Sequence, residues 1–289
     1  MKIGVGLPAT IPGAFGPDIV EWAARADAGP FDSLGVVDRL VYPNHDPLVA
    51  LAAAAAVTSR VQLMTTVLLT PLRNETVLAQ TAATIQSISQ GRFSLGLGIG
   101  WRKDDLDAAG VPFEGRGTRF EAQLATMRAI WAGEPIPTGD FKIGPPIDKA
   151  PEVLMGAMLD GPLRRVGRLA DAYLAAPDPV DEIVRKYGIV CDAWTDAGKP
   201  GKPRMVGGLY YVLGDIEKGY EYMRDYYDFA GSELAEEWVR DLVTSPQKVR
   251  DAMADYESIG MDEMLFHPCV ANLNELDLLA DVVGWGRVG

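Results

Sequence analysis

Residues 93–105 read FSLGLGIGWRKDD, and the rest of the chain is organised around this segment. Four apolar residues alternate with one serine and three glycines, which is the period of a β-strand. The glycine face carries no side chain, so another group can approach the backbone closely. The strand then opens into Trp101 and four charged residues. This pattern indicates a ligand site at the carboxyl end of a strand in an α/β protein, with close packing inside a barrel as the structural alternative.

Seven other apolar segments read as strands, and each precedes a helical pattern: residues 2–7, 33–37, 61–69, 152–156, 172–175, 204–213 and 264–267. Eight β–α units predict an α/β fold, a single (β/α)8 TIM barrel over residues 1–289. The tyrosine-rich run 214–242 is a predicted helical insertion in the C-terminal half, and 276–285 is the predicted closing helix. An open dinucleotide-binding sheet is disfavoured, because the glycines at 96–100 do not form a GxGxxG motif near the first strand.

Composition and charge exclude several classes of protein. The formal net charge of −13 disfavours nucleic acid as a partner, since phosphate backbones need clustered Lys and Arg. The chain lacks an apolar run of the roughly eighteen residues that span a bilayer, and it starts in strand-like sequence, so we predict no membrane partner and no signal peptide. Two isolated cysteines, Cys191 and Cys269, fit a reducing cytoplasm. With two histidines and no ligand cluster, we predict no metal site.

The candidate site residues follow the strands, because ligands of such barrels bind at the carboxyl ends. Asp38 and Arg39 come directly after the second strand. They could hydrogen-bond a ring or an anion, or they could form an ion pair that closes the rim. Thr66, in the third strand, could bind a ring edge or be an ordinary strand residue.

The turn after the fifth strand is a candidate phosphate site. Gly156, Ala157 and Met158 lead into Asp160 and Gly161, where a proline follows and a helix begins. Free backbone N–H groups at a helix start suit a phosphate, and a plain βα turn is the alternative.

Aromatic residues near the strand ends could form the wall of a substrate pocket. They are Tyr42, Trp101 and Phe113, although each could serve ordinary packing instead. His45 is a candidate proton donor, because an imidazole exchanges protons near neutral pH.

Several segments together resemble the luciferase-like monooxygenase superfamily, whose members are flavin- or deazaflavin-dependent (β/α)8 enzymes. The resemblance rests on FDS at 31–33 before DR at 38–39, DPLVAL at 46–51, TTVLLTPLR at 65–73, GRFSLGLGIGWR at 91–102 and GVPFEGRG at 110–117. It covers about the first 130 residues densely and is weaker from 154 to 175, where LADA at 169–172 is the clearest piece.

The resemblance implies that a flavin or deazaflavin ring lies across the barrel mouth, with a non-proline cis peptide bond at Thr66–Val67. The cofactor-binding positions that it implies are Asp38, Thr66, Val67, Leu69, Gly98, Ile99, Gly100, Asp104, Gly156, Ala157, Met158 and Gly161. Two positions depart from the sugar-phosphate dehydrogenases of the superfamily. Arg39 stands where those enzymes have a histidine, and Trp101 where they have a glutamate. Arginine stays protonated and cannot act as a general base, so their substrate chemistry is not expected.

We therefore predict a coenzyme F420-dependent oxidoreductase that transfers hydride between deazaflavin C5 and a small organic substrate. Its candidate catalytic residues are Asp38, Arg39 and His45, and its substrate-binding residues are Tyr42, Trp101 and Phe113. One alternative is an FMN-dependent monooxygenase that activates oxygen at C4a, and another is a non-catalytic flavin-binding barrel. The resemblance also implies a homodimer.

Overall fold

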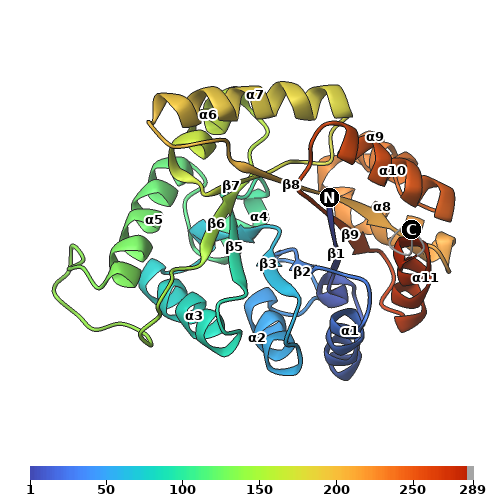
Figure 1. The fold of residues 1–289 in the computed structure, drawn as a ribbon, viewed down its shortest axis with the longest axis horizontal. Coiled ribbons are helices and arrows are strands. Elements are labelled where there is room, and N and C mark those ends of the chain that lie inside the picture. The colour runs from blue at the N-terminus through green and yellow to red at the C-terminus, as the bar shows by residue number, and fades with distance from the viewer. Residues whose placement is uncertain (285–289) are drawn as a thin grey trace.

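The computed structural model describes residues 1–284 and contains a closed parallel barrel (Figure 1). Its strands run in the order β3-β2-β1-β9-β8-β7-β6-β5-β4, and a further pairing of β3 with β5 closes the ring. With β3 and β4 counted as one interrupted strand, the predicted eight-stranded barrel is confirmed. The strands are β1 (Lys2–Gly6), β2 (Ser33–Val36), β3 (Gln62–Thr65), β4 (Leu68–Leu69), β5 (Phe93–Gly98), β6 (Glu152–Met155), β7 (Ala172–Leu174), β8 (Arg204–Tyr211) and β9 (Glu263–Pro268).

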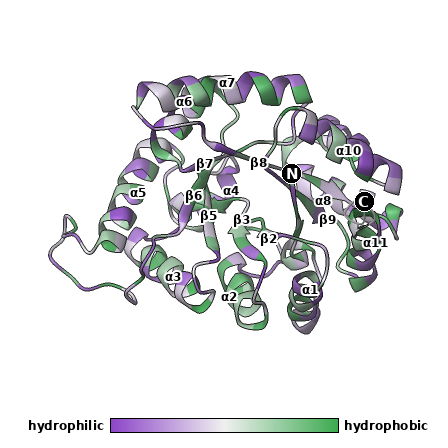
Figure 2. Ribbon diagram, viewed as in Figure 1, coloured by the Kyte–Doolittle hydropathy of each residue, from purple (hydrophilic) through white to green (hydrophobic). Residues whose placement is uncertain are grey.

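Helices surround the strands on the outside of the barrel (Figure 1). They are α1 (Gly16–Ala28), α2 (Pro47–Val57), α3 (Glu75–Ile88), α5 (Arg116–Ala132), α6 (Asp160–Leu169), α7 (Val180–Asp196), α10 (Pro246–Ser258) and α11 (Leu273–Gly284). Figure 2 shows that α6 and α7 carry both apolar and polar residues. This is expected for helices that pack one face against the sheet and expose the other face to solvent. The last predicted helical residue, Trp285, lies outside the described residues. Within residues 1–284, none of the helices combines the length and the apolar character needed to cross a bilayer.

Side-chain caps explain where several helices begin. Asp46 accepts hydrogen bonds from the backbone N–H groups of Leu48 and Val49, at 2.9 and 3.0 Å, and so caps α2. Asn74 caps α3 and Ser245 caps α10 in the same way. Each cap satisfies N–H groups that have no partner within the helix.

Two local predictions were wrong. The third strand was predicted to be continuous over 61–69, but it is interrupted between Thr65 and Leu68. Residues 101–105 were predicted as an aromatic, charged loop, but the short helix α4 (Lys103–Ala108) begins within them. Asp104 and Asp105 lie in its first turn, where carboxylates stabilise a helix N-terminus, and this stabilisation does not depend on an apolar period.

The predicted insertion after β8 is present. It consists of α8 (Ile216–Tyr227), the 3-10 helix η3 (Asp228–Ala230) and α9 (Ser232–Arg240). Its own apolar cluster includes Tyr222, Tyr226, Tyr227 and Val239. A second excursion, residues 133–150, projects away from the barrel between α5 and β6 (Figure 1).

Gly96 lets β5 pass close to β3. A Cβ atom at this position would lie 1.9 Å from the carbonyl oxygen of Thr65, whose hydroxyl donates to the Gly96 carbonyl at 2.6 Å. We expect Gly96→Ala to lower the free energy of unfolding by about 3 kcal/mol, because neither backbone can move away inside a closed barrel. Urea unfolding measures the change. The control is Gly188→Ala on the exposed face of α7, where a Cβ meets no atom within 4 Å. Equal unfolding midpoints for the two variants would contradict the role of Gly96.

Candidate active site at the carboxyl end of the barrel

The barrel opens to solvent at the carboxyl ends of its strands. Deeper strand residues such as Met64, Leu97 and Leu265 are fully buried. Exposure begins at the last positions or just beyond, and the partly exposed residues there are Thr66, Val67, Leu69, Ile99, Gly100, Gly156, Ala157 and His267. These residues form an accessible floor, which is where ligands bind in this architecture.

The interruption of the third strand lies on this floor. The peptide bond between Thr66 and Val67 is cis, as the resemblance implied. Val67 packs against Gly98 on β5, where a Cβ atom would lie 2.6 Å from Val67 Cγ2. The Thr66 hydroxyl faces His267 Nε2 at 3.5 Å.

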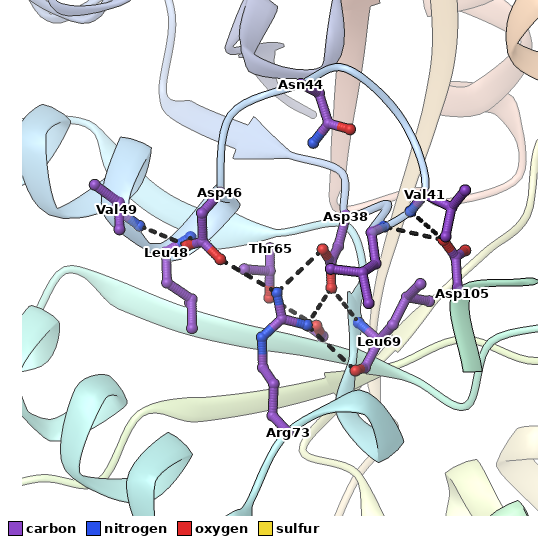
Figure 3. A network of polar contacts seen from close by, with 12 residues as sticks. Asp38, Val41, Asn44, Asp46, Leu48, Val49, Thr65, Leu69, Arg73 and Asp105 are labelled. Atoms are coloured by element: carbon purple, nitrogen blue, oxygen red, sulfur yellow. Dashed lines mark hydrogen bonds and ion pairs between the residues drawn. The ribbon is translucent and has the colours of Figure 1, made fainter. Parts of the chain in front are cut away.

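Asp38 is held by a buried ion pair (Figure 3). Its Oδ2 accepts hydrogen bonds from the backbone N–H of Leu69 at 2.8 Å and from Arg73 Nη1 at 2.5 Å, and its Oδ1 accepts one from Arg73 Nη2 at 3.2 Å. The Asp38 side chain is 2% exposed. Arg73 also donates to the Leu69 carbonyl at 3.3 Å. Asp38 therefore fixes the backbone of Leu69 at the rim, while its charge is neutralised by Arg73.

Arg39 is buried beneath the insertion. Its Nη1 donates to the carbonyl oxygen of Tyr226 at 2.7 Å. Its guanidinium carbon lies 4.0 Å from the ring centroid of Tyr42 and 4.7 Å from that of Tyr226. These contacts are cation–π interactions in a desolvated setting, where they are strongest. Arg39 thus attaches the insertion to the loop after β2.

A second cationic contact attaches the insertion to the loop after β5. Trp101, 48% exposed, packs edge-on against Phe229, with ring centroids 4.8 Å apart. The Arg102 guanidinium carbon lies 3.9 Å from the Phe229 centroid, and Arg102 also pairs with Asp104 and, at 3.4 Å, with Asp105. Asp105 accepts hydrogen bonds from the N–H groups of residues 40 and 41 at 3.0 and 2.7 Å. The loops after β2 and β5 and the insertion therefore form one connected rim.

A cavity of about 90 Å³ lies within this rim. Its lining residues are Asp38, Arg39, Leu69, Trp101, Arg102, Asp105, Tyr226, Tyr227 and Phe229. Four of them were predicted from the sequence as site residues, so the structure brings Asp38, Arg39, Leu69 and Trp101 together. The aromatic residues of the insertion were missed, and the tyrosine-rich composition of 214–242 is the signal that could have found them.

Three other predicted residues lie on the surrounding loops and do not line this cavity. The Tyr42 hydroxyl donates a hydrogen bond to Asp225. Burial raises the pKa of Tyr42, and the Asp225 carboxylate raises it further. His45 is exposed, and its Nε2 contacts the Ala14 carbonyl at 2.9 Å. The Phe113 ring lies 3.7 Å from the guanidinium carbon of Arg116. Their roles toward a substrate stay predictions.

The turn between β6 and α6 lies next along the barrel. A Cβ atom at Gly156 would approach the Leu174 carbonyl oxygen to 2.9 Å, whereas one at Gly161 would meet no atom within 4 Å. Met158 is 55% exposed, and no side chain caps the start of α6. The first turn of α6 therefore has N–H groups that an anionic group can reach.

His267, near the end of β9, was not predicted as a site residue. The residue is partly exposed at the floor, and the desolvation of its imidazole inside the barrel lowers the pKa of His267 to about 4. The sequence carried a usable signal, since a titratable residue at the carboxyl end of a barrel strand is a candidate for function.

A larger cavity of about 550 Å³ lies at the opposite end of the barrel, near the amino ends of β3, β5 and β6. Gln62, Ser94, Lys149, Glu152 and Asp171 are among its lining residues. In this architecture the amino-terminal end contributes to stability, whereas chemistry takes place at the carboxyl end. The smaller cavity and the floor beside it are therefore the candidate active site.

The described residues fit a flat aromatic cofactor that carries a phosphate. The floor is accessible, Trp101 offers an exposed ring at the rim, and the start of α6 is uncapped. The family model of the luciferase-like monooxygenases matches residues 1–263. The chain belongs to the luciferase-like monooxygenase family, a class of oxidoreductases and monooxygenases.

Two relatives from Mycobacterium tuberculosis each align over 170 residues. An uncharacterized protein is 38% identical, over 56% of this chain and 60% of that protein. A phthiodiolone/phenolphthiodiolone dimycocerosates ketoreductase is 35% identical, over 54% of this chain and 44% of that protein. The chain therefore spans less than two thirds of the length of either relative.

Solved structures with the same fold include enzymes of both cofactor types. The monooxygenase RslO1 from Streptomyces bottropensis has a TM-score of 0.80 at 22% identity, over 100% of both chains. An F420-dependent secondary alcohol dehydrogenase in complex with an F420–acetone adduct has a TM-score of 0.81 at 18% identity, over 97% of both chains. The oxygenating constituent of 3,6-diketocamphane monooxygenase from Pseudomonas putida, in complex with FMN, has a TM-score of 0.75 at 18% identity, over 98% of this chain and 96% of that one. At these identities the likeness establishes the fold alone.

Proposed function

We propose that the protein is a coenzyme F420-dependent oxidoreductase that transfers hydride between deazaflavin C5 and a small organic substrate. The observation that carries the proposal is the accessible floor around the Thr66–Val67 turn, which continues through Gly156 to the uncapped start of α6. A planar ring with a phosphate-bearing tail suits this combination of a floor and free N–H groups. The similarity to an F420-dependent secondary alcohol dehydrogenase supports this choice.

The protein's part in this reaction is to bind and to orient. When bound, the deazaflavin supplies the hydride chemistry. Asp38, through Arg73 and the N–H of Leu69, holds the rim rigid beside the ring position. The Arg39 guanidinium places a positive charge under the insertion, held there by its hydrogen bond to the Tyr226 carbonyl oxygen. Trp101 supplies an exposed apolar face for the substrate.

We propose a ketone or a secondary alcohol as the substrate class. The names of two similar proteins, a ketoreductase and a secondary alcohol dehydrogenase, support this class. The small cavity beside Trp101, about 90 Å³, suits a compact reacting group such as a carbonyl. The four aromatic residues among its lining residues would help to exclude water from the reacting atoms.

An FMN-dependent monooxygenase is the second candidate function. The observation that favours it is the similarity to two monooxygenases, one of them in complex with FMN. In that case the same floor would bind the flavin, and the enzyme would consume oxygen.

Turnover assays separate the two functions. We expect the protein to oxidise reduced F420 under nitrogen when a panel of small ketones is supplied. The return of the absorbance of oxidised F420 measures the reaction. Reduced FMN reacts with oxygen without an enzyme, so the comparison follows the organic product, and we expect no oxygenated product from the same panel with reduced FMN and oxygen. An oxygenated product formed only when the protein is present, together with no oxidation of reduced F420, would overturn the proposal in favour of the monooxygenase.

A further inference from the structure

His267 lies on the floor in a space that three glycines, on β1, β2 and β8, leave free. A Cβ atom at Gly6 on β1 would lie 2.6 Å from His267 Nδ1, and one at Gly35 on β2 would lie 3.3 Å from its Cε1. One at Gly208 on β8 would lie 3.3 Å from Nε2. Any side chain at these three positions would compete with the imidazole for the same volume. The barrel is therefore built to admit this ring at the level of the mouth.

The two ring nitrogens have different surroundings. Nδ1 packs against Gly6, whereas Nε2 faces the Thr66 hydroxyl at 3.5 Å, which is longer than a good hydrogen bond. No other hydrogen bond of the His267 ring is found among residues 1–284. Thr66 and His267 are both partly exposed. Two polar atoms thus lie side by side on the floor with unused hydrogen-bonding capacity.

The imidazole is neutral at physiological pH. Burial lowers its pKa to about 4, and no carboxylate contributes to that shift. A neutral imidazole carries one N–H donor and one acceptor nitrogen, and the threonine hydroxyl can donate or accept. The pair can therefore present one donor and one acceptor next to each other without placing a charge beneath the ligand.

We propose that His267 Nε2 and Thr66 Oγ1 together bind the edge of a planar ring that has a carbonyl oxygen beside an N–H group. This is the chemistry of a lactam, which both deazaflavin and flavin rings contain. The inference rests on the proposed function, because it assigns a cofactor-binding role to a residue of that same floor. His267 is a binding residue here, and no proton transfer is attributed to it.

Cofactor titrations of four variants test the pair. His267→Phe keeps a ring in the space between the glycines but removes both nitrogens, and Thr66→Val keeps the shape of the threonine but removes the hydroxyl. Each variant is expected to bind F420 about tenfold more weakly than the wild type, because a tenfold rise in Kd corresponds to the loss of one hydrogen bond. The fluorescence of F420 measures the binding. His267→Asn restores a donor and an acceptor and is expected to bind more tightly than His267→Phe.

The control is Tyr210→Phe, because the Tyr210 ring lies 5.9 Å from His267 but its hydroxyl faces Tyr227 at 3.2 Å. Its affinity is expected to stay within about twofold of the wild type.

NMR spectroscopy of the wild type tests the inference even if a variant fails to fold. The ¹⁵N resonances of His267 should belong to a neutral ring at pH 7, and the Nε2 resonance should shift when F420 is added. This inference alone is overturned if the wild type binds F420 and its Nε2 resonance does not change. It is also overturned alone if the wild type binds F420 and His267→Phe binds it equally tightly. A wild type that binds neither F420 nor FMN overturns the proposed function and this inference with it.

Discussion

Asp38→Asn is expected to lower the free energy of unfolding by about 3 kcal/mol, because it leaves Arg73 without its buried counter-charge. In the wild type the carboxylate accepts two hydrogen bonds from Arg73 and one from the Leu69 N–H, with 2% of the side chain exposed. Asparagine can replace one acceptor but not the charge. Urea unfolding at neutral pH measures the loss, and F420 titration should show weaker binding since Leu69 lies on the floor.

Asp46→Asn is the matched control for this change. Asp46 also pairs with Arg73, but at 3.5 Å and with 49% of its side chain exposed. Exposed pairs contribute little, and asparagine caps a helix as well as aspartate does, so α2 keeps its cap. We expect a change below about 1 kcal/mol. Equal losses for the two variants would contradict the claim that the buried pair with Asp38 organises the rim.

Arg204→Met is expected to have the second large effect, about 3–5 kcal/mol at neutral pH, because it leaves two carboxylates facing each other without a cation. Arg204 bonds Glu152 and Glu263 at 2.6 Å each, at the amino ends of β6, β8 and β9. The Glu263 side chain is 2% exposed, and Ser94 also donates to Glu152 at 2.9 Å. Urea unfolding again provides the measurement. The control, Arg224→Met, removes an exposed pair with Glu236 and should leave the unfolding midpoint unchanged.

The stabilisation by Arg204 should depend on pH. Burial acts to raise the pKa of Glu152, but the hydrogen bond and charge of Arg204 outweigh it and leave that pKa below its ordinary value of 4.5. Because the folded-state pKa is the lower one, this stabilisation is complete above pH 4.5 and is lost as the pH falls through the folded-state pKa. The difference between wild type and Arg204→Met should therefore shrink below pH 4.5. A difference that grows on acidification would contradict the assignment.

Local patterns were enough to predict the barrel. Alternating or continuous apolar runs located the eight strands of the barrel, although not the interruption of the third one. The cis bond at Thr66–Val67 was predicted from the family resemblance alone, since neither propensity nor period signals it. α4 was missed because its stability comes from charges at its first turn and not from an apolar period.

The site was predicted in part, because its contacts join residues far apart in the chain. Asp38 and Arg39 were identified by their place after a strand, but not their partners Arg73 and Tyr226. Arg39 contacts an insertion almost two hundred positions away, and no local pattern encodes that contact. The place of His267 near the end of β9 was readable from the sequence, but the glycines that make room for its ring lie on three other strands and come together only in the closed barrel.

The most direct test of the central claim is a pair of binding titrations of the purified protein, one with F420 and one with FMN, each followed by the cofactor's fluorescence. The proposed function predicts micromolar or tighter binding of F420 and much weaker binding of FMN. Tight binding of FMN with weak binding of F420 would contradict it and would favour the oxygen-activating alternative.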